Sequence, residues 1–313
     1  MEKWDIRALK QSASEALQQA DFSPRRLVLL HSAIAVAAAL LVNFLNLLLT
    51  HQVNGMTTLS SLSSRSTLTA LQYSLSLAFT LLIPLWDAGY TAGAMQLSRR
   101  KPARYQILLE GFRNWKKFVT CGLLLLLQAL ALSYLSFLLA SLLVSLFGSG
   151  LALTGTTPTA QQLSMVIAGF ICAGAAMVYL FYRYRLLYYV ILDYPHTPAS
   201  RILWGASQMM RGRKLQFLRL DASFLWYFIP LFLINSIPYG DILLEKAGYR
   251  LPISSSLLSI LLYLLYAGCI LGLYLWKKNN VSVTYAAAYN AVLQEEASMG
   301  QSPTTPQRSP QGQ

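Results

Sequence analysis

The residue with the clearest chemical potential is Asp87, because it lies inside a long run of apolar residues. The basic residues that follow this run begin at Arg99. In a helix the separation of these two residues is about 18 Å, which would place the carboxylate near the middle of a membrane. An ionised carboxylate at that depth costs roughly 3 kcal/mol or more unless it is paired, hydrated or protonated. Asp87 could therefore be a proton, cation or substrate site, or half of a structural ion pair.

Three other charged residues are candidates for the same polar network. Arg183 and Arg185 interrupt another apolar run, and Asp221 lies where a further run begins. The two arginines could pair with Asp87, or their long side chains could extend to the lipid headgroups. Asp221 could pair with a neighbouring segment on the inner side of the membrane. The candidate network is therefore Asp87, Arg183, Arg185 and Asp221.

Patterns typical of enzymes and metal sites are missing from the sequence. It contains no Walker A sequence, no H-E-x-x-H, no G-x-S-x-G and no dinucleotide fingerprint. The three histidines lie far apart, and the three cysteines lie in apolar runs without a ligand at metal spacing. We expect no cofactor, no metal and no enzymatic activity. The three histidines are His31, His51 and His196, and the three cysteines are Cys121, Cys172 and Cys269.

The composition indicates that these charges belong to a membrane protein. Of the 313 residues, 55% are hydrophobic and only 12% are charged, about half the roughly 25% that is usual in soluble proteins. Mean hydropathy is +0.45. Apolar runs of about 20 residues can cross roughly 30 Å of hydrocarbon. Six such runs predict an all-α bundle of six transmembrane helices, at 27–49, 70–95, 118–147, 163–182, 217–237 and 256–276.

Two of these runs have unusual ends. The third is overlong, so we expect it to tilt or to protrude from the membrane. The fourth has an apolar continuation, 186–192, beyond the two arginines. Either the span ends at the arginines and the continuation lies along the interface, or the span continues through them.

The distribution of basic residues predicts the orientation of the chain. Of its 25 Lys and Arg residues, only Arg65, Lys246 and Arg250 lie in the loops that follow spans one, three and five. Basic residues accumulate on the cytoplasmic side of membrane proteins. Both termini are therefore expected in the cytoplasm. The net charge of +13 is explained by topology, so we expect no nucleic acid partner.

The basic inner segments carry apolar residues at helical spacing. These segments are 1–26, 102–117 and 198–214, and each predicts an amphipathic helix that could lie in the membrane interface and attract anionic headgroups. Each is followed by an outward and a returning span, so we predict three repeats within a membrane domain of residues 27–297. The tail, 298–313, is rich in Pro, Gln, Ser and Thr and is expected to be disordered.

The returning spans share pairs of small residues four positions apart. Small residues at this spacing let helix backbones approach each other closely in lipid. Three pairs at matching positions support the repeat and predict helix packing there: Gly89 and Gly93, Gly169 and Ala173, and Gly268 and Gly272.

Several stretches are similar to a known family. They are the run beginning Ile6-Arg-Ala-Leu-Lys-Gln-Ser-Ala, the stretch from Gly89 to Gly111-Phe112-Arg113, the specific region 183–227 and the helix at 285–293. Over about residues 3–293 the chain resembles the bacterial membrane family called domain of unknown function 975. The resemblance implies a multi-pass protein of the bacterial cytoplasmic membrane. It implies no activity, substrate or catalytic residue.

Three functions are compatible with the sequence. The first is a non-enzymatic scaffold or assembly factor of the membrane or envelope, which binds lipids and unidentified membrane proteins. The alternative is a transporter or exporter component in which Asp87 is an intramembrane proton, cation or substrate site. The third, an intramembrane enzyme, has no motif in its favour. A polar cavity that reaches Asp87 would favour transport, and a dry, sealed bundle would favour the scaffold.

Overall fold

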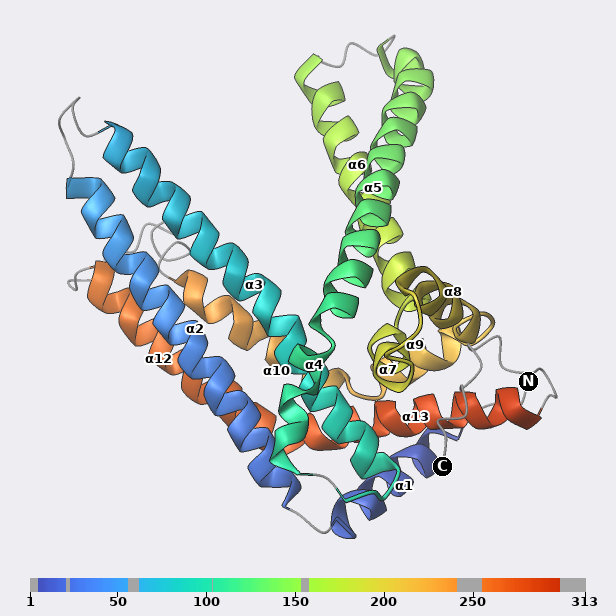
Figure 1. The fold of residues 1–313 in the computed structure, drawn as a ribbon. Coiled ribbons are helices and arrows are strands. Elements are labelled where there is room, and N and C mark those ends of the chain that lie inside the picture. Colours follow the sequence, from blue (N-terminus) through green and yellow to red (C-terminus); the bar gives the residue numbers. More distant parts are fainter. Residues whose placement is uncertain are drawn as a thin grey trace. The chain divides into compact units, whose positions relative to one another are not determined.

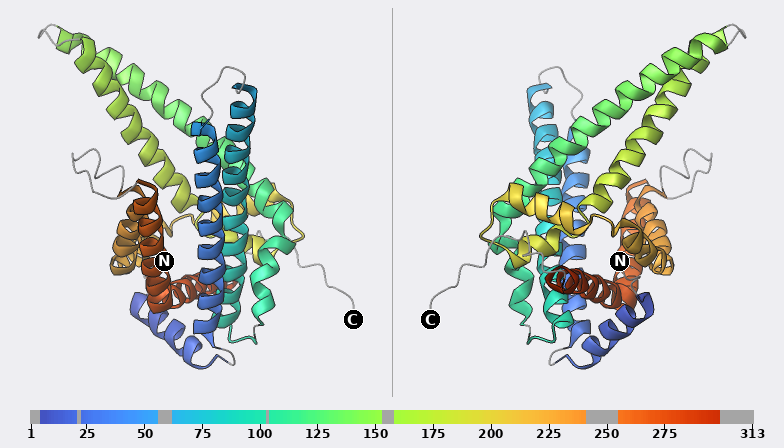
Figure 2. Two further views of the ribbon diagram at one scale, coloured as in Figure 1. Left: turned by 90° about the vertical axis from the view of Figure 1, so that its left-hand side faces the viewer. Right: turned by 90° about the vertical axis from the view of Figure 1, so that its right-hand side faces the viewer.

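The computed structural model describes residues 5–20, 23–55, 62–102, 104–152, 158–240 and 255–298, and all regular structure in these ranges is helical. The chain divides into two compact units, which are coloured by sequence in Figures 1 and 2. Unit 1 comprises residues up to 115 and 218–298, and unit 2 comprises 116–217. The predicted disordered tail lies outside the described residues, except for Ser298.

Unit 1 contains the N-terminal and C-terminal helices. In chain order these are α1 (Ile6–Gln18), α2 (Pro24–Gly55), α3 (Leu62–Ser98), η2 (Tyr105–Leu109), α4 (Glu110–Arg113), α10 (Leu225–Ser236), η3 (Ile237–Tyr239), α12 (Ser255–Leu273), η4 (Tyr274–Lys278) and α13 (Asn279–Ser298). Unit 2 contains α5 (Trp115–Ala152), α6 (Pro158–Arg183), α7 (Leu187–Asp193) and α8 (Ala199–Met209), and α9 (Lys214–Ala222) leads back to unit 1.

The described helices confirm an all-α, multi-pass membrane protein. Five segments are long and apolar enough to cross a membrane, and a bent pair of helices raises the number to six if it counts as one span. The five are Pro24–Asn46, Ser66–Ser98, Trp115–Leu139, Ile167–Asp193 and Ile260–Ser298. The grouping into three repeats stays a prediction.

The fifth expected span, 217–237, is not a straight helix. It is divided between α9 and α10, which are inclined to each other by 72°. The 12 residues of α10 extend about 18 Å, much less than the hydrocarbon thickness of roughly 30 Å. This segment is therefore a broken or re-entrant span.

Polar contacts within unit 1 stabilise the break between α9 and α10. The hydroxyl of Ser223 donates to the carbonyl oxygen of Leu220 at 2.6 Å. Lys10 of α1 donates to the carbonyl oxygen of Ser223 at 3.0 Å, and Tyr285 of α13 donates to the carboxylate of Asp221. The break thus has its own hydrogen-bond partners, which an apolar segment in lipid would lack.

The helix of the fourth span breaks at the arginines, although the candidate span Ile167–Asp193 runs through them. Helix α6 ends at Arg183, and the apolar continuation forms the separate short helix α7. Ring contacts between Phe118 and Tyr188, 5.4 Å apart, join α5 to α7 within unit 2.

Two of the three expected inner helices are continuous. Helix α1 buries Ala13 and Ala16, and α8 buries Ile202, Leu203 and Ala206. Each therefore presents its apolar face to protein. The third, expected over 102–117, is instead interrupted: η2 is a 3₁₀ turn, α4 has four residues, and a new helix begins at Trp115.

A reciprocal backbone contact explains this interruption. A Cβ atom at Gly89 of α3 would lie 1.9 Å from the carbonyl oxygen of Leu108, and one at Gly111 would lie 1.8 Å from the carbonyl oxygen of Leu85. The two segments therefore touch backbone to backbone at two points, which only glycine permits. The tight 3₁₀ turn brings the carbonyl of Leu108 against α3.

Candidate functional site

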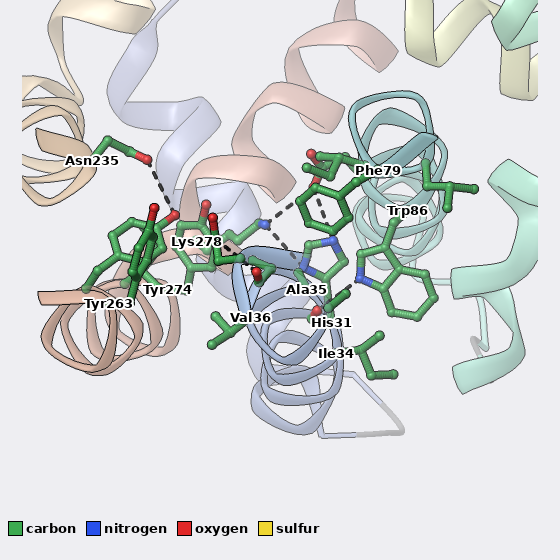
Figure 3. A pocket seen from close by; sticks show the side chains of 18 of the residues that line it. His31, Ile34, Ala35, Val36, Phe79, Trp86, Asn235, Tyr263, Tyr274 and Lys278 are labelled. Carbon is green, nitrogen blue, oxygen red and sulfur yellow. Dashed lines mark hydrogen bonds and ion pairs between the residues drawn. The ribbon is translucent and has the colours of Figure 1, made fainter. Parts of the chain in front are cut away.

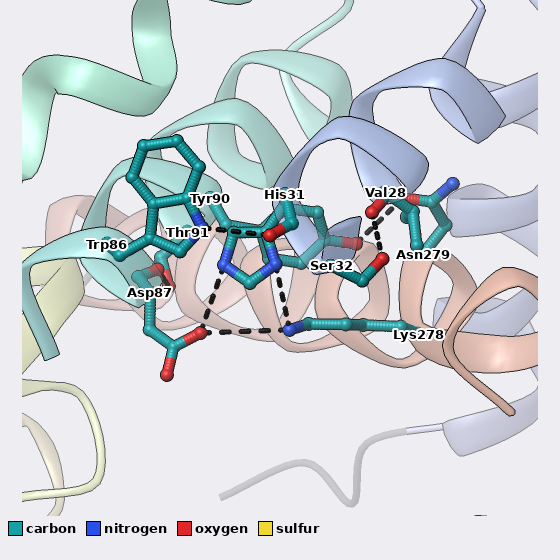
Figure 4. A network of polar contacts seen from close by, with 9 residues as sticks. All are labelled: Val28, His31, Ser32, Trp86, Asp87, Tyr90, Thr91, Lys278 and Asn279. Atoms are coloured by element: carbon teal, nitrogen blue, oxygen red, sulfur yellow. Dashed lines mark hydrogen bonds and ion pairs between the residues drawn. The ribbon is translucent and has the colours of Figure 1, made fainter. Parts of the chain in front are cut away.

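Three ionisable side chains from three helices meet inside unit 1 (Figure 4). The Nε2 atom of His31 lies 3.1 Å from a carboxylate oxygen of Asp87. The ammonium nitrogen of Lys278 lies 3.7 Å from the same oxygen and 3.3 Å from Nδ1 of His31. The three groups form a closed triangle of polar contacts, which we call the charge cluster.

Local helix geometry places Asp87 in the charge cluster. On α3 it lies two residues from both Leu85 and Gly89, which touch η2 and α4. Residues two apart point about 200° away from each other around a helix. The face of α3 opposite that backbone contact therefore carries the carboxylate towards α2 and η4.

Lys278 reaches the charge cluster from an unusual turn. The five residues of η4 form a π-helical turn between α12 and α13, and the chain changes direction there (Figure 1). Such wide turns alter the direction of side chains and are frequent at functional sites. Here the turn ends on the lysine itself.

The contacts indicate which nitrogen of the His31 ring carries the proton. An ammonium group can only donate hydrogen bonds, so Nδ1 of His31 accepts from Lys278. A neutral ring then carries its proton on Nε2, which faces Asp87. The Nε2 proton is not aligned for a regular hydrogen bond to this oxygen. We therefore describe the His31–Asp87 contact as a close polar contact that a small rotation of either side chain would align.

Aromatic rings enclose the positive side of the charge cluster. The Lys278 ammonium lies 4.1 Å from the ring centre of Tyr274 and 4.8 Å from that of Tyr90. His31 stacks on Trp86 with 14° between the ring planes. The indole of Trp86 also donates to the carbonyl oxygen of His31 at 2.9 Å. The rings stabilise a cation by their quadrupoles and exclude water from its stem.

The charge cluster lines a cavity of about 510 Å³, and Figure 3 shows His31 and Lys278 among the lining side chains. The side chain of Asp87 is 49% exposed, whereas those of His31 and Lys278 are 1% and 12% exposed. The carboxylate is thus the member of the cluster that a bound solute could reach. All residues that line this cavity belong to unit 1.

Small residues on α2 create the volume of the cavity. Ala35, Ala38 and Ala39 line it between the charged end and Asn43. From His31 to Asn43 the helix rises about 18 Å. The far end is polar again: Asn43 and Asn235 line it, and the hydroxyl of Tyr266 lies 3.5 Å from the amide oxygen of Asn235. The cavity is therefore elongated, charged at one end and uncharged but polar at the other.

The charge cluster can hold and relay a proton. With Asp87 ionised, Lys278 protonated and His31 neutral, its formal charge is zero. Transfer of one proton from Lys278 to Nδ1 and another from Nε2 to Asp87 would leave all three groups neutral. Binding of a cation at the exposed oxygens of Asp87 would compete with Lys278 for the carboxylate. The arrangement therefore allows exchange of a proton for a cation or a basic group.

The four charges expected to form one network have different contacts. Asp87 contacts His31 and Lys278, and Asp221 accepts from Tyr285. In unit 2, Arg183 donates to the hydroxyl of Ser207 at 2.9 Å, and the guanidinium of Arg185 lies 4.5 Å from the ring centre of Phe181. The sequence analysis therefore did not identify His31 and Lys278 as the partners of Asp87.

The expected small-residue pairs also differ in their surroundings. Gly93 lies close to Leu27, and Gly169 lies close to Phe137, with a built Cβ atom 3.0 Å from each side chain. Ala173 is half-buried. A Cβ atom at Gly268 or Gly272 would meet no atom of the described residues within 4 Å.

Sequence reasoning missed His31 and Lys278 for identifiable reasons. His31 was considered only as a metal ligand, and Lys278 only as a basic residue that sets topology. A more useful signal was the distance of each charged residue from the end of its helix. In the sequence His31 lies near the start of α2 and Lys278 near the end of η4, and Asp87 lies only about 16 Å from Ser98, the last residue of α3. A cation from a neighbouring helix is one way to stabilise a carboxylate at that position.

Metal chemistry has no obvious ligands here. Within the described ranges, no three His, Cys, Asp or Glu side chains are grouped so that they could hold a metal ion. The three cysteines are free thiols, and Cys121 is buried.

Comparison with known proteins gives one match. A family model described as "Protein of unknown function (DUF975)" matches residues 4–295, which include every residue of the charge cluster and its cavity. No curated protein and no solved structure matches the chain.

Proposed function

Since the chain belongs to the DUF975 family, whose description gives no function, we propose a function from its own site. We infer that it is a component of a membrane transporter or exporter. In this function Asp87 binds a proton, a cation or a basic group of the substrate inside the membrane, and His31 and Lys278 compensate its charge.

The observation that carries this proposal is the half-exposed carboxylate at the end of the cavity. A carboxylate that served only to neutralise Lys278 would need no surface facing an open cavity. Asp87 instead lines a space of about 510 Å³, and its side chain is 49% exposed. Ionisable residues within spans commonly mark ion or substrate pathways.

The scaffold function, which the sequence suggested first, has less support. That function requires only a sealed bundle with an exposed binding surface. The cavity, its polar ends and the broken segment at α9 and α10 are features that transport uses, since transporters bind substrates near broken helices. The proposed function involves neither catalysis nor a cofactor.

We further propose that the protein lies in the bacterial cytoplasmic membrane with both termini in the cytoplasm. The 22 basic residues that lie outside the loops after spans one, three and five support this orientation. Membrane lipids, including anionic headgroups, are its expected surroundings. Fusions of a fluorescent protein and of alkaline phosphatase to each terminus test the topology. A periplasmically active phosphatase at either terminus would refute it.

Ion flux tests the proposed transport. The full chain is reconstituted in vesicles that contain a pH-sensitive dye. A potassium diffusion potential is then imposed together with a gradient of H⁺, of Na⁺ or of a mixture of substrates. We expect flux in the wild type, its loss in Asp87→Asn, and normal flux in Glu15→Gln, which removes an exposed carboxylate. Flux that is equal in the wild type and Asp87→Asn, or no flux under any gradient, would refute the proposal.

A further inference from the structure

A second cavity, in unit 2, is lined by basic residues. It has a volume of about 510 Å³ and is formed by the end of α6, the end of α8 and the turn into α9. Arg183, Arg211 and Lys214 line it, and no acidic side chain lies among the described residues of its wall. Three cations around one concave space are favourable only if an anion or water compensates their repulsion.

The protein holds two of these cations in place. Arg183 donates through Nε to the hydroxyl of Ser207 at 2.9 Å, which leaves its other nitrogens available. The Lys214 ammonium lies 4.0 Å from the ring centre of Tyr179. The guanidinium of Arg211 is exposed and has no interaction with another described residue.

The turn that carries Arg211 and Lys214 has a defined shape. Gly212 has a φ of 78°, in the left-handed region that other residues rarely adopt. The next residue, Arg213, is 3% exposed, and its guanidinium donates to the carbonyl oxygen of Met209 at 2.9 Å. A buried arginine therefore fixes the turn to the end of α8, and the cations on either side belong to a preformed site.

We propose that this cavity binds the phosphate group of an anionic phospholipid. Arginine presents several donors that match phosphate oxygens, and three cations exceed the charge of one phosphodiester. Arg183 lies at the end of α6, within the candidate span Ile167–Asp193. This inference is independent of the charge cluster, which belongs to unit 1.

Apolar residues beside the cavity favour a lipid over a soluble phosphate ester. Tyr179 lies one helical turn before Arg183 and is 49% exposed, and Leu215, which also lines the cavity, is 67% exposed. An aromatic ring next to a cation at the end of a span is typical of the headgroup region. Acyl chains could lie along α6 while the phosphate occupies the cavity.

Lipid binding to single-charge variants tests this site. The full chain is delipidated in detergent, and binding of phosphatidylglycerol and phosphatidylcholine is measured by native mass spectrometry. Each basic residue contributes about a fivefold gain in affinity for an anionic surface. We expect phosphatidylglycerol to bind about fivefold more weakly to Arg211→Gln and about 100-fold more weakly when Arg183, Arg211 and Lys214 are all replaced by Gln.

Arg201→Gln is the matched control, because Arg201 lies exposed on α8 outside the cavity. It should bind phosphatidylglycerol as the wild type does. Equal weakening in Arg201→Gln and Arg211→Gln would overturn the proposal, because it would show diffuse attraction to the surface. Displacement of the lipid by equimolar inorganic phosphate or glycerol phosphate would overturn the assignment to a lipid. Thermal unfolding of each variant shows whether it folds, and Arg211→Gln should fold because it removes no protein contact.

Discussion

The Nζ atom of Lys278 lies 3.3 Å from Nδ1 of His31, although 247 residues separate them in the sequence. This contact joins α2, the first long helix of unit 1, to η4, the π-helical turn near the C-terminal end of that unit. Both residues also approach Asp87, so the charge cluster joins α2, α3 and η4 at one carboxylate.

The first prediction concerns the pair of Asp87 and Lys278. Asp87→Asn leaves the largely buried ammonium without its carboxylate, so the free energy of unfolding should fall by about 3 kcal/mol. The double variant with Lys278→Gln should regain part of this loss, because it removes the uncompensated charge. Thermal unfolding in detergent measures both. Additive losses in the double variant would show that the two side chains do not interact.

The second prediction concerns the volume of the cavity. Ala39→Leu should fill part of the space next to α2 and abolish Asp87-dependent flux, with a stability change below about 1.5 kcal/mol. Ala37→Leu is the matched control, because Ala37 is exposed on the same helix and does not line the cavity. It should leave flux unchanged. Normal flux in Ala39→Leu would show that the cavity is not the pathway.

The third prediction compares two glycines that belong to similar small-residue pairs in the sequence but have different surroundings in the structure. Gly89→Ala would place a Cβ atom 1.9 Å from the carbonyl oxygen of Leu108, so it should destabilise the protein by about 3 kcal/mol or prevent folding. Gly272→Ala meets open space and should be neutral or stabilising by up to about 1 kcal/mol. Membrane abundance and thermal unfolding measure both. An equal loss in the two variants would contradict the backbone contact.

The fourth prediction concerns the break between α9 and α10. Tyr285→Phe removes the hydrogen bond to the carboxylate of Asp221, and bonds to charged groups contribute roughly 2 kcal/mol. We expect a corresponding loss in the free energy of unfolding. Tyr73→Phe, at a ring that is 72% exposed, should have no effect. Unchanged stability in Tyr285→Phe would show that the break does not depend on this contact.

Much of the fold follows from hydrophobic run length, because a helix in lipid satisfies its own hydrogen bonds. The sequence thus locates the second and fourth spans, although the expected bounds, 70–95 and 163–182, differ from those of the candidate spans Ser66–Ser98 and Ile167–Asp193. The break in the fifth is not, because it depends on Lys10 and Tyr285, which lie far away in the chain.

The site was predictable only in its central residue. Asp87 is conspicuous because a carboxylate is costly within an apolar run. His31 and Lys278 are not, because each stands near a helix end where a polar residue is ordinary. Their convergence depends on how α2, α3 and η4 come together. A single sequence contains no signal for that packing beyond the shared depth of the three residues.

The two glycine contacts of α3 have a mechanical consequence for Asp87. Leu85 and Gly89 are fixed against Gly111 and Leu108, and the carboxylate projects from the helical turn between these two fixed points. Backbone-to-backbone contact leaves no side chain that could yield by changing its rotamer. Segment 105–113 and this turn of α3 must therefore move as one rigid lever. A displacement of that segment would move the carboxylate relative to His31 and Lys278, without any need for α3 to unwind.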